Sequence, residues 1–162
     1  MRTPLNKFTF KSRKIKEWVE ERCYGLTLNL FAGETVLDIE NEIRNDMREG
    51  FQCHYTMDAL SFCRYYREAN CEDASFLFDT VVLDPPYSYR KSMEMYEGAV
   101  TSPFNTLKDA LIPIITENSR IITFGYHSVS MGKKRGFEIE EICVMSHGGA
   151  IHDTIATVEI RQ

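Results

Sequence analysis

The stretch FLFDTVVLDPPY, residues 76–87, decides the fold that we expect for this chain. Its first eight residues form an almost continuously apolar run, which is typical of a strand buried on both faces of a parallel sheet. Two prolines then end the strand, because each ring fixes φ and removes the N–H that a continuing strand would donate. We therefore expect Asp84 directly beyond the end of a central strand.

Helical and extended patterns alternate on both sides of this strand. Apolar residues at helical spacing predict a helix from Ser12 to Tyr24, a second that Asp58 begins as N-cap, and a third that Ser102-Pro103 opens. The third helix should carry Leu107 to Ile115 and be kinked by Pro113. Strands are expected at 26–31, 42–46, 51–56, 76–83, 120–126, 137–147 and 153–160.

This order predicts an α/β fold of three layers with a mostly parallel, seven-stranded, Rossmann-like sheet. The last two strands, which meet at the Gly148-Gly149 turn, would form a C-terminal antiparallel hairpin. The segment 34–46 has no convincing helical face, so the first crossover should be short. The 162 residues are 43% hydrophobic and 27% charged, so we expect one domain, 1–162, without a separate target-recognition domain.

A sheet of this kind binds its ligand beyond the carboxyl ends of its strands. The expected strands bring polar and aromatic residues from six places to that edge. These places are 29–33, Asp46, Asp58, 84–87, 126–127 and 147–153.

The residues Asp84, Pro85, Pro86 and Tyr87 suit a substrate with an amino group on a planar ring. Because the prolines stop the strand, the carbonyls of Asp84 and Pro85 are left to accept hydrogen bonds beside the carboxylate. Accepting both amino hydrogens would draw the nitrogen lone pair out of conjugation, while Tyr87 stacks on the ring. The alternative is a strand end turned by two prolines, with an acid that resembles an N-cap.

Residues 84–87 resemble the DPPY motif of the S-adenosylmethionine-dependent amino-methyltransferases, above all the DNA adenine-N6 enzymes. In that family the motif follows the fourth strand, and 76–83 is the fourth strand expected here. Upstream, LNLFAGE (28–34) resembles the family's cofactor motif, with Asn29 in place of the usual acid and Gly33 as the retained glycine. The resemblance covers nearly the whole chain and implies the class I methyltransferase fold, S-adenosylmethionine as cofactor, and adenine N6 in DNA as methyl acceptor.

The resemblance also implies cofactor contacts. The segment before the first helix and the loop after the first strand would supply them through Phe10, Lys11, Ser12, Asn29, Phe31, Ala32 and Gly33. Asp46 would bind the ribose hydroxyls, with Asp38 as the alternative. Asp58 would accept from the adenine amino group of the cofactor, cap its helix, or do both.

Basic and aromatic residues near the same edge are candidate contacts to the nucleic acid. They are Arg90, Lys91, Tyr126, His127, Lys133 and Lys134. Both basic pairs are expected to border the pocket and contact phosphates, against the alternative of an ordinary solvated surface. Tyr126 and His127 would contact the target base or serve as ordinary loop residues.

Other features narrow the functional class. The five cysteines include no CxxC pair and HGGAIHD (147–153) matches no common zinc spacing, so we expect no metal. The chain shows neither a signal peptide nor an apolar run of membrane-spanning length, so we expect a cytoplasmic protein. The net charge of −5 disfavours a broad nucleic-acid surface, so specificity would come from loops 88–102 and 127–136, a homodimer or a partner subunit.

Two other functions remain open. An RNA amino-methyltransferase acting on adenine or guanine is the alternative within the enzyme class, because such enzymes use related four-residue motifs. A cofactor-binding, non-catalytic subunit is favoured by the degenerate glycine motif and disfavoured by the complete motif at 84–87.

Overall fold

The computed structural model describes residues 1–3, 9–70, 73–85, 104–126, 128, 130–147 and 152–162. Its helices are α1 (Arg13–Glu20), α2 (Ala59–Asn70) and α4 (Phe104–Leu111). Its 3-10 turns are η1 (Thr9–Lys11), η2 (Ala74–Phe76), η3 (Ile112–Ile114) and η4 (Lys133–Arg135). Its strands are β1 (Thr27–Asn29), β2 (Glu42–Arg44), β3 (Phe78–Leu83), β4 (Ile115–Gly125), β5 (Phe137–Met145) and β6 (Thr154–Arg161).

The strands form one sheet in the order β2-β1-β3-β4-β6-β5. The first four are mutually parallel, and β6 runs antiparallel to both β4 and β5. The expected parallel core and C-terminal hairpin are therefore confirmed. We call the edge at which β1 to β4 end the carboxyl edge, and the opposite one the amino edge.

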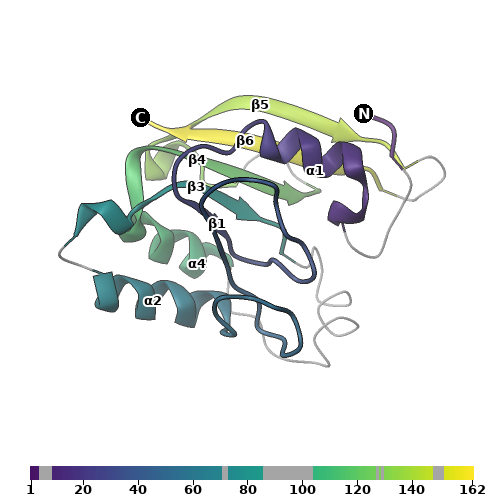
Figure 1. Cartoon of the computed structure of the whole chain (residues 1–162). Coiled ribbons are helices and arrows are strands. Elements are labelled where there is room, and N and C mark those ends of the chain that lie inside the picture. The colour runs from purple at the N-terminus through teal and green to yellow at the C-terminus, as the bar shows by residue number, and fades with distance from the viewer. Residues whose placement is uncertain (4–8, 71–72, 86–103, 127, 129, 148–151) are drawn as a thin grey trace.

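Helices cover both faces of the sheet, which makes three layers (Figure 1). On one face α1 packs Ile15, Trp18 and Val19 against Val82 of β3 and Ile122 of β4. On the other face α2 and α4 cover a second core that includes the side chains of Leu28, Val81, Leu83 and Ile121. β3 is buried along almost its whole length, as its apolar sequence predicts.

The expected third strand at 51–56 is wrong, and among the residues that the structure describes the sheet has six strands instead of seven. Among the described residues, the strand-type pairing of this segment is limited to an isolated bridge between Asn45 and Tyr55. The N–H groups of His54 and Tyr55 both donate to the Arg44 carbonyl, and the Arg44 side chain donates to the Gln52 carbonyl. These backbone N–H and carbonyl groups therefore already have hydrogen-bond partners near Arg44, and no strand ladder extends along the segment.

Two further boundaries differ from the sequence-based expectation. α1 ends at Glu20, four residues before Tyr24, and the chain turns at Gly25. The helix after 103 ends at Leu111, where the expected break at Pro113 produces η3, and Ile115 already belongs to β4. The crossover from β1 to β2 contains no helix, which confirms the short connection predicted for it.

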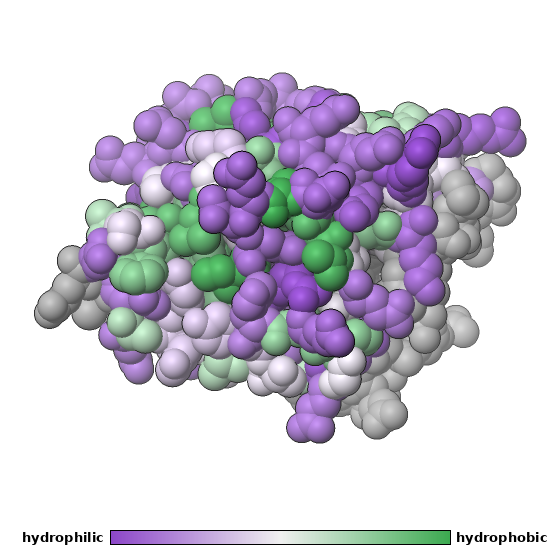
Figure 2. All heavy atoms as spheres, viewed as in Figure 1, coloured by the Kyte–Doolittle hydropathy of each residue, from purple (hydrophilic) through white to green (hydrophobic). Residues whose placement is uncertain are grey.

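The outer surface is mostly hydrophilic on the side drawn in Figure 2, with small apolar areas enclosed by polar side chains. Val36 and Tyr24 are examples of singly exposed apolar residues. Scattered residues of this kind are normal for a folded surface. Within the described ranges, no helix is both long and apolar enough to span a membrane.

Candidate functional site

The loop after β1 is tied to the end of β2 by the buried carboxylate of Asp46. Its Oδ2 accepts from the Gly33 N–H at 2.9 Å, and its Oδ1 accepts from the Arg48 N–H at 2.9 Å. Gly33 has a φ of +52°, a conformation that favours glycine. Asp46 therefore closes β2 at the carboxyl edge as expected, but it points into the loop.

The rival ribose ligand, Asp38, lies at the other end of the molecule's parallel strands. It precedes β2, and its backbone N–H donates to the carboxylate of Glu20, the last residue of α1. The neighbouring Asn41 pairs with Thr27 where β1 begins. Asp38 is thus near the amino edge, and only Asp46 reaches the carboxyl edge.

Two side chains that the sequence did not single out, those of Asn45 and Glu42, support the loop after β1 through hydrogen bonds. Asn45, 1% exposed, donates to the carbonyls of Leu30 and Met57 at 3.2 and 3.0 Å. Glu42 accepts from the Asn29 side chain at 3.0 Å and from the Leu37 N–H at 3.1 Å. The signal available in the sequence was a polar residue at the end of an apolar strand. It did not reveal the hydrogen-bond partners of Asn45 and Glu42, because these partners are distant in sequence.

The Glu42 carboxyl supplies a pH test of this support. Burial raises its pKa above the ordinary value, and hydrogen bonds from Asn29 and Leu37 oppose that shift. A raised pKa in the folded state means that the folded protein keeps the proton longer than the unfolded chain does. Its contribution to stability is complete below the unfolded pKa and is lost as pH rises through the raised one.

We therefore expect wild type to lose stability relative to Glu42→Gln as pH rises from about 4.3, the unfolded pKa of a glutamate. Melting temperatures of both proteins between pH 4 and pH 7.5 check this. Glutamine has a single side-chain oxygen and can accept from Asn29 or from Leu37 but not from both, so a constant offset is expected as well. A difference that stays the same across the range, or changes the other way, contradicts the prediction.

The N-terminal segment reaches the loop after β1, as the resemblance implied. A hollow of about 320 Å³ is lined by Phe10, Lys11, Lys16, Glu34, Thr35 and Val36. The Lys11 ammonium lies 3.8 Å from the Glu34 carboxylate. Phe10 anchors the segment by packing edge-on against Phe124, and Ser12 is the N-cap of α1. An opposite pair of charges therefore lies at the mouth of a hollow beside the glycine loop.

The other expected cofactor residues support this loop from inside. Asn29 is fully buried and turns its amide toward Glu42, while Ala32 is 2% exposed and donates its N–H to the Asn45 carbonyl. Phe31 packs partly buried against the core beneath α2. These residues hold the loop in shape, and only Gly33 presents its backbone there.

Asp58 and Asp84 also lie at the carboxyl edge. One oxygen of Asp58 accepts from the N–H groups of Leu60 and Ser61, both at 3.1 Å, so the expected N-cap of α2 is confirmed. Asp84 and Pro85 follow β3 directly and are partly exposed. Pro86, Tyr87, Arg90 and Lys91 lie outside the described residues.

Tyr126 follows β4 at this edge, and its ring centroid is 5.1 Å from that of His152. His127 lies outside the described residues. His147 hydrogen-bonds Thr3 and Thr154 at 3.2 and 2.8 Å, which ties the N-terminus to the hairpin. In the part of the chain that the structure describes, no three His, Cys, Asp or Glu side chains gather as metal ligands would.

The expectation that Lys133 and Lys134 border the pocket is wrong. They belong to η4, which ends next to the start of β5, and β5 begins opposite Arg161 at the amino edge. The Gln162 N–H donates to the Gly136 carbonyl there. β5 runs in the same direction as β4, because both are antiparallel to β6. β5 must therefore start at the amino edge, and η4, which precedes it directly, lies at that edge too.

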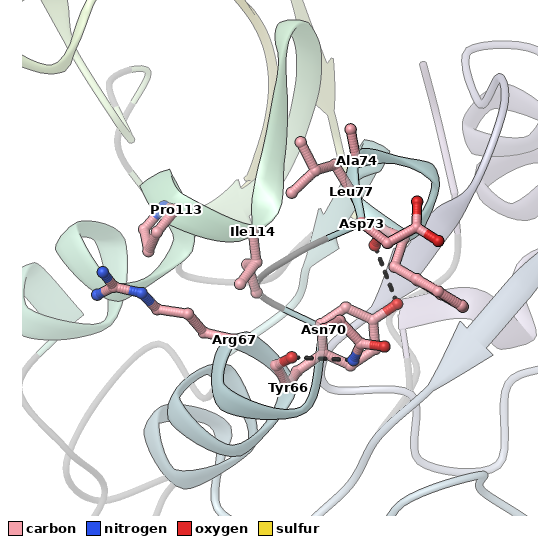
Figure 3. Close-up of a pocket in the computed structure, with 9 residues that line it drawn as sticks. Tyr66, Arg67, Asn70, Asp73, Ala74, Leu77, Pro113 and Ile114 are labelled. Atoms are coloured by element: carbon pink, nitrogen blue, oxygen red, sulfur yellow. Dashed lines mark hydrogen bonds between the residues drawn. The ribbon is translucent and has the colours of Figure 1, made fainter.

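A second hollow, of about 290 Å³, also lies at the amino edge (Figure 3). It is formed by the end of α2, η2 and η3, with Arg67, Asp73 and Pro113 around it. The Tyr66 hydroxyl donates to the Phe76 carbonyl at 3.0 Å, and Asn70 donates to the Tyr66 carbonyl at 2.9 Å. The strands separate this hollow from Asp84, so it takes no part in the candidate site.

The residues at the carboxyl edge fit an S-adenosyl cofactor. Asp46 has a carboxylate of the kind that binds a ribose diol, and both of its oxygens accept hydrogen bonds within the protein. The side chains of Lys11 and Glu34 match the carboxylate and ammonium of an amino acid. A Cβ on Gly33 would lie 3.6 Å from Arg48 and 3.9 Å from Asp46, which are ordinary contacts, so the positive φ is what favours glycine there.

No family model matches this sequence, and no curated protein matches it. Solved structures do match. TrmN from Thermus thermophilus aligns over 97% of this chain and 50% of its own, with 11% identity and a TM-score of 0.63. A putative SAM-dependent methyltransferase from Streptococcus mutans aligns over 96% and 50%, with 15% identity and a TM-score of 0.66.

This chain has the α/β fold of the methyltransferases. A further match, a putative methyltransferase complexed with SAH, aligns over 91% of this chain and 48% of its own, with 13% identity and a TM-score of 0.62. The methyltransferase-like chain described here spans about half the length of each of these three structures. At these identities the similarity establishes the fold, with its parallel core and antiparallel C-terminal strands.

Proposed function

We propose that this protein transfers a methyl group from S-adenosylmethionine to an exocyclic amino nitrogen of a nucleic-acid base, with adenine N6 in DNA as the acceptor. The observation that carries the proposal is the position of Asp84 and Pro85. They follow the central strand β3 at the same edge as the Gly33 loop and Asp46. An acceptor for amino hydrogens and a cofactor-compatible loop thus share one edge.

The cofactor supplies, when bound, a methyl group on a positively charged sulfur. The residues of this chain provide orientation. The Asp84 carboxylate and the Pro85 carbonyl accept the two amino hydrogens, so that the nitrogen lone pair is no longer shared with the ring. Transfer would form a nitrogen–methyl bond in place of the methyl–sulfur bond, and the nitrogen would then release one proton to Asp84 or water. Positioning is the main contribution to the rate.

Transfer of tritiated methyl to unmethylated DNA and to total RNA, followed by nucleoside analysis, tests the proposal. Label in N6-methyladenine from DNA is the expected result. Label confined to RNA would move the acceptor to adenine or guanine in RNA. Binding of S-adenosylhomocysteine without transfer to either polymer would overturn the enzymatic proposal and favour a non-catalytic subunit.

The Lys11 and Glu34 pair allows a separate test of cofactor binding. Lys11→Met should weaken binding of S-adenosylhomocysteine about tenfold, because an ammonium–carboxylate hydrogen bond to the amino-acid part is lost. Lys14→Met, which removes an exposed lysine from the first turn of α1, is the matched control. Titration calorimetry of the two variants measures both effects, and equal affinities would remove Lys11 from the site.

A further inference from the structure

Asp46 already has partners at both carboxylate oxygens. It is 2% exposed, and besides Gly33 it binds Arg48 through the backbone N–H at 2.9 Å and through Nε at 3.4 Å. The Arg48 side chain is only 23% exposed, so the guanidinium lies largely within the protein surface above Asp46. A ribose diol that approaches Oδ1 would meet this guanidinium first.

The same guanidinium lies between the glycine loop and an aromatic ring. A Cβ built on Gly33 would be 3.6 Å from Nη2 of Arg48, an ordinary van der Waals distance, so the guanidinium lies beside the glycine loop. Its central carbon is 4.4 Å from the ring centroid of Phe51, a typical cation–π distance. Asp46, Gly33 and Phe51 thus lie around the guanidinium of Arg48, and we call the space that this planar, hydrogen-bonding group fills the slot.

A purine nucleoside has the properties that this slot selects. Its ring is planar and stacks on an aromatic side chain, and its hydroxyls donate to a carboxylate. We infer that the slot is the nucleoside site of the cofactor, that Phe51 stacks on the adenine ring, and that Arg48 occupies the slot until the cofactor displaces it. This inference rests on the proposed function, because it assumes an S-adenosyl ligand.

An internal occupant lowers the apparent affinity for the ligand by the fraction of molecules in which the slot is open. If Arg48 fills the slot in about four molecules of five, its removal tightens binding about fivefold. A guanidinium that simply supported the site would have the opposite effect when removed. The direction of the change therefore separates the two roles.

The experiment is titration calorimetry of S-adenosylhomocysteine against wild type, Arg48→Met and Phe51→Leu, with Arg64→Met as control. Methionine keeps the apolar stem of Arg48 without the guanidinium, and Arg64 is an exposed arginine on α2. We expect binding about fivefold tighter for Arg48→Met, weaker by about tenfold for Phe51→Leu, and unchanged for the control. Thermal unfolding of each variant verifies that it is folded.

If folded Arg48→Met binds S-adenosylhomocysteine with the same affinity as wild type, or more weakly, the inference is overturned and the proposed function still stands. Binding by Arg48→Met where wild type shows none supports it most directly. Absence of binding by every folded variant and wild type refutes both the nucleoside slot and the proposed cofactor. Phe51→Leu with full affinity would remove Phe51 from the slot.

Discussion

Asp84→Ala is expected to reduce methyl transfer at least about a hundredfold, while affinity for S-adenosylhomocysteine changes less than about twofold. The carboxylate follows β3. Under the proposed function it accepts from the substrate amino group, so its loss would remove the group that orients the nitrogen lone pair. The supports of the cofactor loop are Asn45, Asp46 and Glu42, which the substitution leaves untouched. Rate and cofactor affinity should therefore separate.

The measurement is initial-rate transfer of tritiated methyl to the polymer that wild type methylates, with calorimetry of S-adenosylhomocysteine alongside. Asp73→Asn is the matched control, because Asp73 caps η2 at the amino edge and asparagine is also a good N-cap. It should retain the wild-type rate. An Asp84→Ala protein that binds cofactor and keeps most of its activity would show that the residue only ends the strand.

Gly25→Ala is expected to cost about 3 kcal/mol of stability, since steric clash and backbone strain add at one position. Gly25 has a φ of +59°, and a Cβ there would lie 2.0 Å from Oδ2 and 2.6 Å from Cγ of Asp79. Asp79 cannot move without loss, because it accepts from the Leu26 N–H at 2.9 Å and from the Thr116 hydroxyl at 3.2 Å. These bonds connect the entry of β1 to β3 and β4.

Gly50→Ala is the control that introduces backbone strain without a steric clash. Gly50 also has a positive φ, +89°, but a Cβ there would meet nothing within 4 Å. We expect a loss of about 1 kcal/mol for Gly50→Ala, and a melting temperature about 6 to 12 °C below wild type for Gly25→Ala. Equal destabilisation of the two variants would mean that Asp79 adapts and that only the backbone conformation matters.

Much of the architecture could be predicted because its signals are local. The apolar run at 78–83 ends at two prolines, Asp58 precedes a helical pattern, and Pro113 cannot continue a helix. Each signal acts within a few residues, so periodicity and backbone chemistry were sufficient. The carboxyl edge followed as a consequence, and with it the grouping of Gly33, Asp46, Asp58 and Asp84.

The false third strand shows where local patterns fail. FQCHYT alternates and has suitable residues for a strand, yet a strand exists only if its backbone groups find a ladder partner. The carbonyl of Arg44 takes two of its N–H groups and the Arg44 side chain takes the Gln52 carbonyl. Nothing in the sequence of the segment predicts that the Arg44 side chain, eight residues before Gln52, takes a carbonyl that a strand partner would need.

The sequence by itself determined the order of the helices and strands apart from the false strand at 51–56, the end of β3 before Asp84, and the sheet edge at which Gly33, Asp46 and Asp84 lie. These features follow from periodicity and proline chemistry. Only the tertiary structure decided which charges meet. It placed Lys133 and Lys134 at the amino edge, because they directly precede β5, and β5 starts at the same edge as β4. It also brought the Gly33 N–H to the carboxylate of Asp46 from a separate loop, because a buried carboxylate must find hydrogen-bond donors.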